Sequence, residues 1–233
     1  MPFRMATLKR CEVLRDLPDT VVRDIARTCA WNSVAAGKQI VMANERTRDV
    51  YFVTKGKLRA LLYSAAEGKP VLFATISADE MFGELSALDG EPRSVTIEAS
   101  SDCTLAILSK DQFLRLLETH PEFSLLIMQK LARKVRALSD RIFEFSTLSV
   151  QARVHAELLR LAMLAGGEKN GQALISPAPL LADFAARIST HREAVSRVLS
   201  RIQDMGIARR EGPDLRILDL ERLRALHRDA RGE

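Results

Sequence analysis

The feature that most constrains the fold is a change in the spacing of apolar residues at Pro121. Before it, the chain from Trp31 to Leu108 consists of short apolar runs separated by glycine-containing turns, a pattern typical of antiparallel β-structure. After it, no glycine or proline occurs from Glu122 to Leu164, and apolar residues recur every three or four positions, which predicts long α-helix. We therefore expect an α+β chain, with a β-rich domain followed by a helical part.

Several segments of the first part have the length and composition of β-strands. They are rich in valine, isoleucine, leucine and aromatic residues, and they follow one another at roughly 8–15-residue spacing. The expected strands cover residues 50–53, 58–63, 71–76, 94–99 and 104–108, with a turn at 67–70. This pattern predicts an antiparallel sandwich or jelly roll, preceded by a short helix at Thr20–Ala30.

The helix after Pro121 carries a regular apolar seam. Its members are spaced 3, 4, 3, 4 and 3 residues apart, which is the a/d spacing of a coiled coil: Met128, Leu131, Val135, Leu138, Ile142 and Phe145. Such a seam packs either on the helix's own domain or on a second copy of the chain. Its regularity on a linker helix favours a parallel homodimer.

The last part of the chain has the pattern of a winged helix-turn-helix. A further helix to about Leu164 and a glycine-rich loop precede two short helices that meet near Ser189. Pro179 suits the first position of the earlier helix, and its expected apolar stripe is Leu180, Leu181, Phe184, Ala185 and Ile188. A turn at 209–214 between two apolar runs predicts a β-hairpin wing.

Positive charge gathers in this part of the chain. The whole sequence has 35 Lys and Arg against 30 Asp and Glu, a net charge of +5. Between Arg187 and Arg210, six arginines face only Glu193 and Asp204. Because the second helix of the pair carries arginines opposite its apolar residues, the local excess predicts a face for nucleic acid or a membrane surface.

A second group of polar residues lies between positions 82 and 95. Gly83 opens a predicted short helix with Glu84 in its first turn, and Arg93 and Ser94 lead into a strand. A helix N-terminus and an arginine together suit a phosphate, whereas Glu84 can accept a hydrogen bond from a ribose hydroxyl. A cyclic nucleotide is therefore chemically sensible here. The alternative is structural, with a helix cap, a turn and a surface charge.

These residues closely resemble the phosphate-binding cassette of the cyclic-nucleotide-binding domain. The cassette reads Gly-Glu-Leu or Gly-Glu-Ile, then Arg with Ser or Thr and a small apolar residue; here it is Gly83-Glu84-Leu85 and Arg93-Ser94-Val95. The order of roll, long helix and helix-turn-helix resembles the Crp/Fnr family of bacterial transcription regulators. The similarity covers nearly the whole chain from about Leu8.

The resemblance implies a role for each cassette residue. Gly83 and Leu85 would present backbone groups to the nucleotide, Glu84 would bind the ribose 2′-hydroxyl, and Arg93 with Ser94 would hold the cyclic phosphate.

Three residues of the long helix complete the implied nucleotide site. Lys134 and Ser139 occupy positions where cyclic-AMP-binding members carry an arginine near the glutamate and a serine that reaches the purine from the partner subunit. Leu138 stands where those members have a threonine, and the cassette is one residue shorter here. Cyclic AMP is the expected effector, with adenine against guanine left open and cyclic GMP as the alternative.

The segment Thr190–Leu199 resembles the recognition helix of the family. Arginine suits the O6 and N7 atoms of guanine, and glutamate accepts from N4 of cytosine. The alternative role for Glu193 is a capping box with Thr190, at Thr-x-x-Glu spacing. The expected DNA contacts, wing included, are Thr190, His191, Arg192, Glu193, Ser196, Arg197, Arg201 and Arg209.

The sequence thus predicts a homodimeric, cyclic-nucleotide-responsive transcription regulator that binds an inverted repeat in double-stranded DNA and engages RNA polymerase. We expect a roll domain at 1–120, a dimerisation helix and hinge at 121–149, and a winged helix-turn-helix at 150–233. Two alternatives stay open. One is a member of the same family that responds to cyclic GMP, another effector or none, and the other is a cyclic-nucleotide-binding regulatory subunit without a DNA role.

Other classes of protein lack their signatures. The patterns H-x-x-x-H, G-x-S-x-G and the phosphate-binding G-x-x-x-x-G-K-[ST] are absent, so we expect no enzyme. Cys11, Cys29 and Cys103 form no C-x-x-C pair and are too few for a four-cysteine cluster, so we expect no metal and no iron–sulfur cluster. The family resemblance implies no haem either, since the carbon-monoxide-sensing branch has a Cys-x-His where this chain has Gly83-Glu84. With no apolar run long enough to span a membrane and no secretory signal, we expect a cytoplasmic protein that does not contact membranes.

Overall fold

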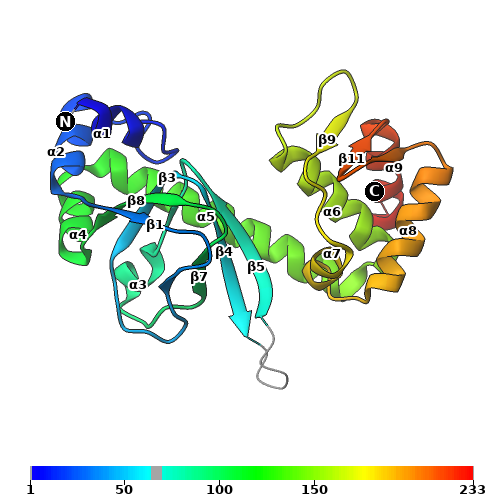
Figure 1. Ribbon diagram of the computed structural model, residues 1–233, viewed down its shortest axis with the longest axis horizontal. Coiled ribbons are helices and arrows are strands. Elements are labelled where there is room, and N and C mark those ends of the chain that lie inside the picture. Colours follow the sequence, from blue (N-terminus) through cyan, green and yellow to red (C-terminus); the bar gives the residue numbers. More distant parts are fainter. Residues whose placement is uncertain (1, 64–69, 233) are drawn as a thin grey trace. The chain divides into compact units, whose positions relative to one another are not determined.

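The computed structural model describes residues 2–63 and 70–232 and contains two compact units, Met1–Val135 and Arg136–Glu233 (Figure 1). One helix, α5 (Pro121–Thr147), contributes residues to both units. The turn predicted at 67–70 falls mainly on residues 67–69, which lie outside the described residues. The predicted domain boundaries after residues 120 and 149 stay a prediction.

The part of the first unit that the structure describes contains two four-stranded antiparallel sheets (Figure 1). The first has the order β1-β8-β3-β6, with bounds Ala30–Val34, Cys103–Leu108, Val50–Lys55 and Met81–Phe82. The second has the order β2-β7-β4-β5, with bounds Gln39–Val41, Thr96–Ala99, Lys57–Tyr63 and Pro70–Ser77. The antiparallel roll predicted from the sequence is therefore confirmed.

Burial explains why these segments form strands. The run from Val50 to Thr54 is buried because both faces of β3 are covered: Val50 and Phe52 belong to the core that the helices share, and Tyr51 and Val53 belong to a second core with residues of the other sheet. In β4 the buried Leu58 and Ala60 flank the exposed Arg59, the alternation of a strand with one face on the core. The sequence patterns missed β1, β2 and β6, which are short or carry polar residues inside the strand.

Helices cover the first sheet. α1 (Pro2–Leu8), α2 (Asp19–Thr28) and α4 (Lys110–Thr119) contribute to one apolar core with β3, β8 and the start of α5. The helix predicted at Thr20–Ala30 is confirmed as α2. α4 was not predicted, although Ser109 and Gln112 form a capping box at its start.

The second unit is the predicted winged helix-turn-helix. Its described helices are α6 (Val150–Leu164), α7 (Leu181–Arg187), α8 (Arg192–Asp204) and α9 (Leu220–Arg231). Its described sheet has the order β10-β11-β9, with bounds Ala208–Glu211, Asp214–Ile217 and Ala173–Ile175. The predicted wing is the β10–β11 hairpin, and β9 adds a third strand to it.

Two details of the helix pair were predicted wrongly. α7 begins at Leu181 rather than at Pro179, because the amide of Ala178 donates to the carbonyl of Pro213 and keeps this segment extended beside the wing. Leu180 is 72% exposed, so the predicted apolar stripe reaches the core only from Phe184 onward. The second helix begins at Arg192 rather than at Ser189-Thr190, since Ser189 takes a left-handed conformation with φ 50°.

A buried charge cluster joins the second half of α5 to the helices that follow. The Glu157 side chain is 2% exposed and accepts hydrogen bonds from Arg141 at 2.9 Å, Arg160 at 3.3 Å and Arg187 at 3.3 Å. Arg160 also contacts Glu144 of α5 at 2.6 Å. These contacts fix the end of α5 on α6 and α7, although the helix breaks before Val150.

Two histidines join α6 to α9 inside the second unit. His155 of α6 is buried close to the backbone of Leu226, and His227 of α9 lies close to the backbone of Ala152. Nδ1 of each imidazole is buried without a hydrogen-bond partner in the described structure. Burial is the main cause that lowers the pKa of both imidazoles below the usual 6.5. Each of the two helices therefore carries, against the other, a histidine whose protonation is disfavoured by burial.

We expect the second unit to lose stability as the pH falls below about 6.5, the ordinary histidine value. In that range the unfolded chain binds protons that the folded unit excludes, so protonation favours unfolding. Thermal unfolding between pH 8 and pH 5 measures this, and His155→Gln should flatten the dependence. His191→Gln, at an exposed position of the same unit, is the control. An unchanged pH dependence in His155→Gln would contradict the assignment.

Candidate ligand and nucleic-acid sites

The cassette is built around a glycine that no other residue can replace without strain. β6 passes through Gly83 into the short helix α3 (Glu84–Asp89), and Gly83 has a φ of 88°. A Cβ atom at Gly83 would lie 2.6 Å from the carbonyl oxygen of Asp49 and 2.8 Å from Nη1 of Arg93. Glycine is therefore required both by the backbone conformation and by the close approach of these groups.

Arg93 is a buried cation whose described partners are all uncharged. Its side chain is among the buried polar groups, at 3% exposure. Nη1 donates to the carbonyl of Gly83 at 3.1 Å, Nη2 to that of Asp49 at 2.7 Å and Nε to the hydroxyl of Thr47 at 3.1 Å. Within residues 2–63 and 70–232, no carboxylate pairs with this guanidinium. Its charge is therefore available to an anion.

Glu84 lies at the other side of the glycine and is 1% exposed. Its Oε1 accepts a hydrogen bond from Nζ of Lys134 on α5 at 2.6 Å. The predicted residues Gly83, Glu84, Arg93 and Lys134 thus lie together, linked by direct contacts. The carboxylate already has one donor, and its remaining lone pairs can accept a hydroxyl.

The other predicted nucleotide residues are less closely joined to this group. Leu85 is 44% exposed on α3, and Ser94 is exposed at the turn that follows Arg93. Leu138 and Ser139 belong to the second unit, beyond Val135. Their roles stay predictions.

Sequence reasoning missed two residues of the cassette. Thr47 binds Arg93 through its hydroxyl, and Nζ of Lys130 donates to the carbonyl of Met81 at 2.7 Å. The spacing of Lys130 and Lys134, four residues apart on one helix, was the available signal for the second. Nothing in the sequence pattern marks Thr47.

The predicted seam on α5 is exposed over much of its length. Met128, Val135, Leu138 and Ile142 are between 51% and 67% exposed. Leu131 differs, because it packs against the core of its own roll.

Phe145, the last predicted member of the seam, makes cation–π contacts with two arginines. The guanidinium groups of Arg141 and Arg153 lie 5.6 and 5.7 Å from the ring centre. A straight helix has 3.6 residues per turn, so a seam repeating every 3.5 residues drifts around it. The predicted face is therefore interrupted rather than continuous.

The helix α8 presents the predicted polar residues to solvent. Arg192, Ser196, Arg197 and Arg201 are exposed, and Val195 and Ile202 on the opposite side are buried. This arrangement agrees with the predicted division of the helix into a core face and a polar face.

The capping box predicted between Thr190 and Glu193 is wrong. The N-cap of α8 is His191, which makes Glu193 the second residue of the helix instead of the third. The Glu193 carboxylate instead accepts from Nε of Arg192 at 2.8 Å. This contact also lowers the pKa of Glu193, so the carboxylate is charged at neutral pH.

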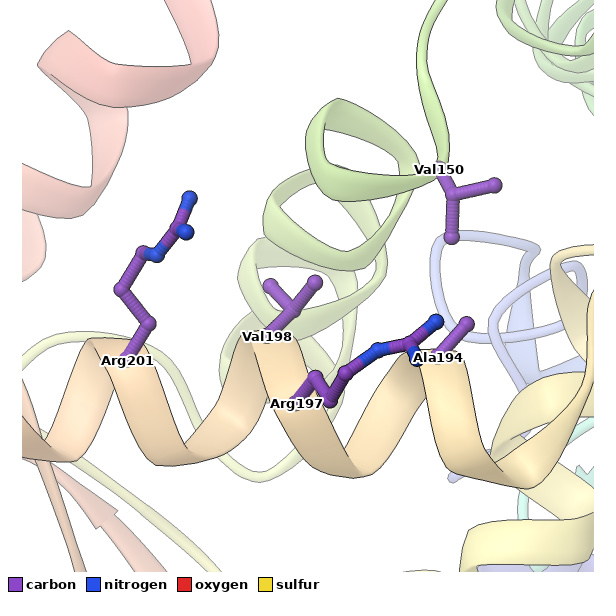
Figure 2. Close-up of a pocket in the computed structure, with 5 residues that line it drawn as sticks. All are labelled: Val150, Ala194, Arg197, Val198 and Arg201. Atoms are coloured by element: carbon purple, nitrogen blue, oxygen red, sulfur yellow. The ribbon is translucent and has the colours of Figure 1, made fainter.

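A pocket of about 220 Å³ lies where α8 meets the start of α6 (Figure 2). Its lining includes Val150, Ala194 and Val198 together with two arginines. Figure 2 shows the Arg197 side chain lying along α8 toward Ala194, whereas Arg201 stands away from the helix. Nη1 of Arg201 donates to Oε1 of Gln151 at 3.1 Å. The two arginines thus differ, since Arg201 has a partner on α6.

The wing arginine is also paired. Nη2 of Arg209 lies 3.0 Å from Oε1 of Glu211, and Glu211 also contacts Arg216. Both arginines lower the pKa of Glu211. Arg209 is 65% exposed despite this contact and can reach a phosphate.

Among the residues with described positions, no group of three or more His, Cys, Asp or Glu side chains is arranged to hold a metal ion. In the same residues, no helix has the length and apolar character needed to cross a membrane. The three cysteines are buried, and burial raises the pKa of Cys11 and of Cys29 to about 12.

Comparison with known proteins accounts for both units. Residues 31–120 match the family model described as "Cyclic nucleotide-binding domain", and residues 152–226 match the "Crp-like helix-turn-helix domain". The "CRP-like cAMP-activated global transcriptional regulator" of Mycobacterium tuberculosis is 26% identical over 216 residues, 93% of this chain and 96% of that protein. The "cAMP-activated global transcriptional regulator CRP" of Pasteurella multocida is 25% identical over 190 residues, 79% and 88% of the two chains.

The solved structures agree in fold. A CooA mutant from Carboxydothermus hydrogenoformans has a TM-score of 0.75 at 20% identity and covers 93% of this chain and 94% of its own. At that identity the likeness shows the fold alone.

We expect Gly83→Ala to destabilise the first unit far more than Gly37→Ala. Both positions have positive φ, which costs an alanine about 1–2 kcal/mol, but a Cβ at Gly37 meets nothing within 4 Å. Gly83→Ala adds the collision with Asp49 and Arg93, for a total loss of about 3 kcal/mol or more. Urea unfolding measures both changes. Equal losses in the two variants would show that the cassette is not closely packed around Gly83.

Proposed function

The chain belongs to the Crp/Fnr family of cyclic-nucleotide-binding, DNA-binding transcription regulators, and on this premise we propose that it is a homodimer whose affinity for a palindromic promoter site is set by cyclic AMP. Its relatives are transcription regulators, not enzymes. The proposed dimer acts in the cytoplasm, with RNA polymerase as its partner at the promoter. The nucleotide and DNA sites are the residues assigned above.

The nucleotide proposal rests on two buried charged side chains that lie on either side of Gly83. Arg93 is a buried cation with three uncharged acceptors, and Glu84 is a buried carboxylate that forms an ion pair with Lys134. A cyclic nucleotide has one phosphate charge and a free 2′-hydroxyl on the same small ring system. It therefore offers an anion to Arg93 and a hydroxyl donor to Glu84 at one time.

Two observations bear on which nucleotide is bound. The relatives in Mycobacterium tuberculosis and Pasteurella multocida are both named as cAMP-activated, which supports cyclic AMP. Leu138 has no hydrogen-bonding group for a purine, so it provides no reason to prefer adenine over guanine. Cyclic GMP is therefore the alternative, and a regulator that responds to another effector is the outcome if neither nucleotide binds.

The exposed apolar residues of α5 support a second copy of the chain as the dimer partner. Met128, Val135, Leu138 and Ile142 lie at heptad-like spacing on a helix of 27 residues. An identical helix in parallel has the same spacing and can bury the same residues. A parallel pair relates the two α8 helices by a two-fold axis, which explains the expectation of an inverted repeat.

On α8, charge and exposure favour base contacts by Arg197 and Glu193. Arg197 matches the O6 and N7 atoms of guanine, and the ionised Glu193 can accept from cytosine. Arg192 is held by Glu193 in the free protein and becomes available when the carboxylate turns to a base. Arg201 and the wing residue Arg209 are proposed to contact phosphates.

Arg93→Ala should weaken cyclic AMP binding by about 2 kcal/mol or more, roughly 30-fold, because charge-assisted hydrogen bonds to the phosphate are lost. Calorimetry with cyclic AMP and cyclic GMP measures the effect. Arg59→Ala, which removes an arginine of β4 that pairs with Glu98 outside the cassette, is the matched control.

Because Arg93 also holds the loop of Thr47 and Asp49, its loss can disturb the fold. Arg93→Lys, which keeps the charge and loses the paired donors, therefore accompanies it. Wild-type affinity in a folded Arg93→Ala variant would exclude this residue as the phosphate ligand.

Selection of binding sites from randomised duplexes tests the DNA assignment. We expect an inverted repeat with half-site centres about 34–36 Å apart, and Arg197→Ala should lose about 1–3 kcal/mol of discrimination at one G·C pair. Arg209→Ala should weaken all sequences alike and lower the salt slope by about one. A site without two-fold symmetry would contradict the dimer, and an unchanged profile for Arg197→Ala would contradict its base contact.

A further inference from the structure

Two lysines of α5 hold the two sides of the cassette glycine. Lys130 donates to the carbonyl of Met81 at 2.7 Å, and Lys134 donates to the carboxylate of Glu84 at 2.6 Å. The lysines are four residues apart, so they project from one face of the helix. Met81 and Glu84 stand on either side of Phe82 and Gly83. The helix is therefore attached to both the strand that enters the cassette and the helix that leaves it.

The position of β6 explains why a lysine binds the Met81 carbonyl. In the described sheet β6 is an edge strand, paired only with β3. The carbonyl of Glu80 accepts from the amide of Val53 at 2.9 Å, so the next carbonyl along the strand points away from β3. Met81 is 4% exposed, and its outward carbonyl needs a donor because water is largely excluded. Lys130 supplies that donor.

The two lysine contacts differ in their chemistry. The Glu84 carboxylate is the group proposed to accept the ribose hydroxyl, so a bound nucleotide changes the partners of Lys134. The Met81 carbonyl belongs to a strand and already accepts a hydrogen bond from Lys130 of α5. We therefore expect the nucleotide not to bind it. Binding therefore alters one lysine contact and leaves the other in place.

The surroundings of Lys130 fit a permanent contact. Burial lowers the pKa of its ammonium group, while Glu84, Glu80 and Glu12 favour the charged form and Lys134 opposes it. Its neighbour Arg133 contacts Glu12 at 2.5 Å, but both of those side chains are more than half exposed. The Lys130–Met81 contact is thus more enclosed than the Arg133–Glu12 contact, and it is the one that touches the cassette strand β6.

We propose that Lys130 is a positioning residue for nucleotide binding: it holds α5 against the strand β6, so that Lys134 stays within reach of Glu84 in the free and the bound protein. This inference rests on the function proposed above. As a consequence, a change in the hydrogen-bond partners of Glu84 is transmitted to α5 through Lys134, because Lys130 keeps the helix against the cassette. Without Lys130, the cassette loses its fixed contact with the helix and orders less well around the nucleotide.

The first test uses amide hydrogen exchange in the full-length, nucleotide-free protein. Lys130→Met keeps the apolar stem and removes the donor, and we expect exchange over residues 81–90 to rise about tenfold or more, as one lost contact predicts. Arg133→Met is the matched control, since it removes an α5 contact with the roll that does not touch the cassette. Lys130→Arg, which retains donors at the end of a long side chain, should restore most of the protection.

The pattern of exchange separates positioning from general stability. A merely structural role would raise exchange throughout the roll, including β7 and β8, whereas a positioning role confines the increase to residues 81–90. Calorimetry with cyclic AMP on the same variants should then show about tenfold weaker binding for Lys130→Met and little change for Arg133→Met.

Each outcome decides one of the two proposals. Exchange over 81–90 that equals wild type in Lys130→Met, or rises equally in Arg133→Met, overturns the role of Lys130. Failure of the wild-type protein to bind either cyclic nucleotide contradicts the proposed function, while the exchange experiment still decides whether Lys130 holds the cassette.

Discussion

The first unit depends on a buried guanidinium that no described carboxylate neutralises. Arginine stays protonated in proteins, so Arg93 cannot escape the cost of burial by losing its charge. The roll stabilises it with the oxygen atoms of Thr47, Asp49 and Gly83, which come from segments far apart in the sequence. These contacts leave the positive charge uncompensated, and they force the chain to pass through Gly83 in a conformation that only glycine adopts easily. Packing and the proposed phosphate contact therefore depend on the same side chain.

The helix α5 belongs to both units, and each half is held by different chemistry. Its first half contacts the roll through the ammonium groups of Lys130 and Lys134. Its second half enters the buried cluster around Glu157, where arginines from three helices share one carboxylate. A ligand affects DNA affinity only if it favours one arrangement of the protein over another. In the proposed site a nucleotide adds a partner to both Arg93 and Glu84, and Glu84 also contacts α5, through Lys134.

Sequence patterns predicted the main elements because each depends on local periodicity. The apolar runs of β3, β4, β5, β7 and β8, the long helices and the wing all followed from residue spacing. Patterns failed where a neighbour distant in the sequence decides the outcome. The first turn of α7 is delayed because Ala178 bonds to Pro213, and Leu131 packs against the core of its own roll, whereas Met128, Val135, Leu138 and Ile142 stay exposed.

By itself, the sequence determined the order of roll, long helix and winged helix-turn-helix, the two halves of the cassette, and the arginine-rich face of α8. These features are encoded in spacing and residue type within short stretches. Only the tertiary structure decided which oxygen atoms surround Arg93, that Lys134, expected near Glu84 from the family resemblance, donates directly to its carboxylate, and that Lys130 binds the edge strand. Those contacts join residues 10 to 50 positions apart. They exist because the sheets and α5 bring these segments together, a geometry that no local pattern specifies.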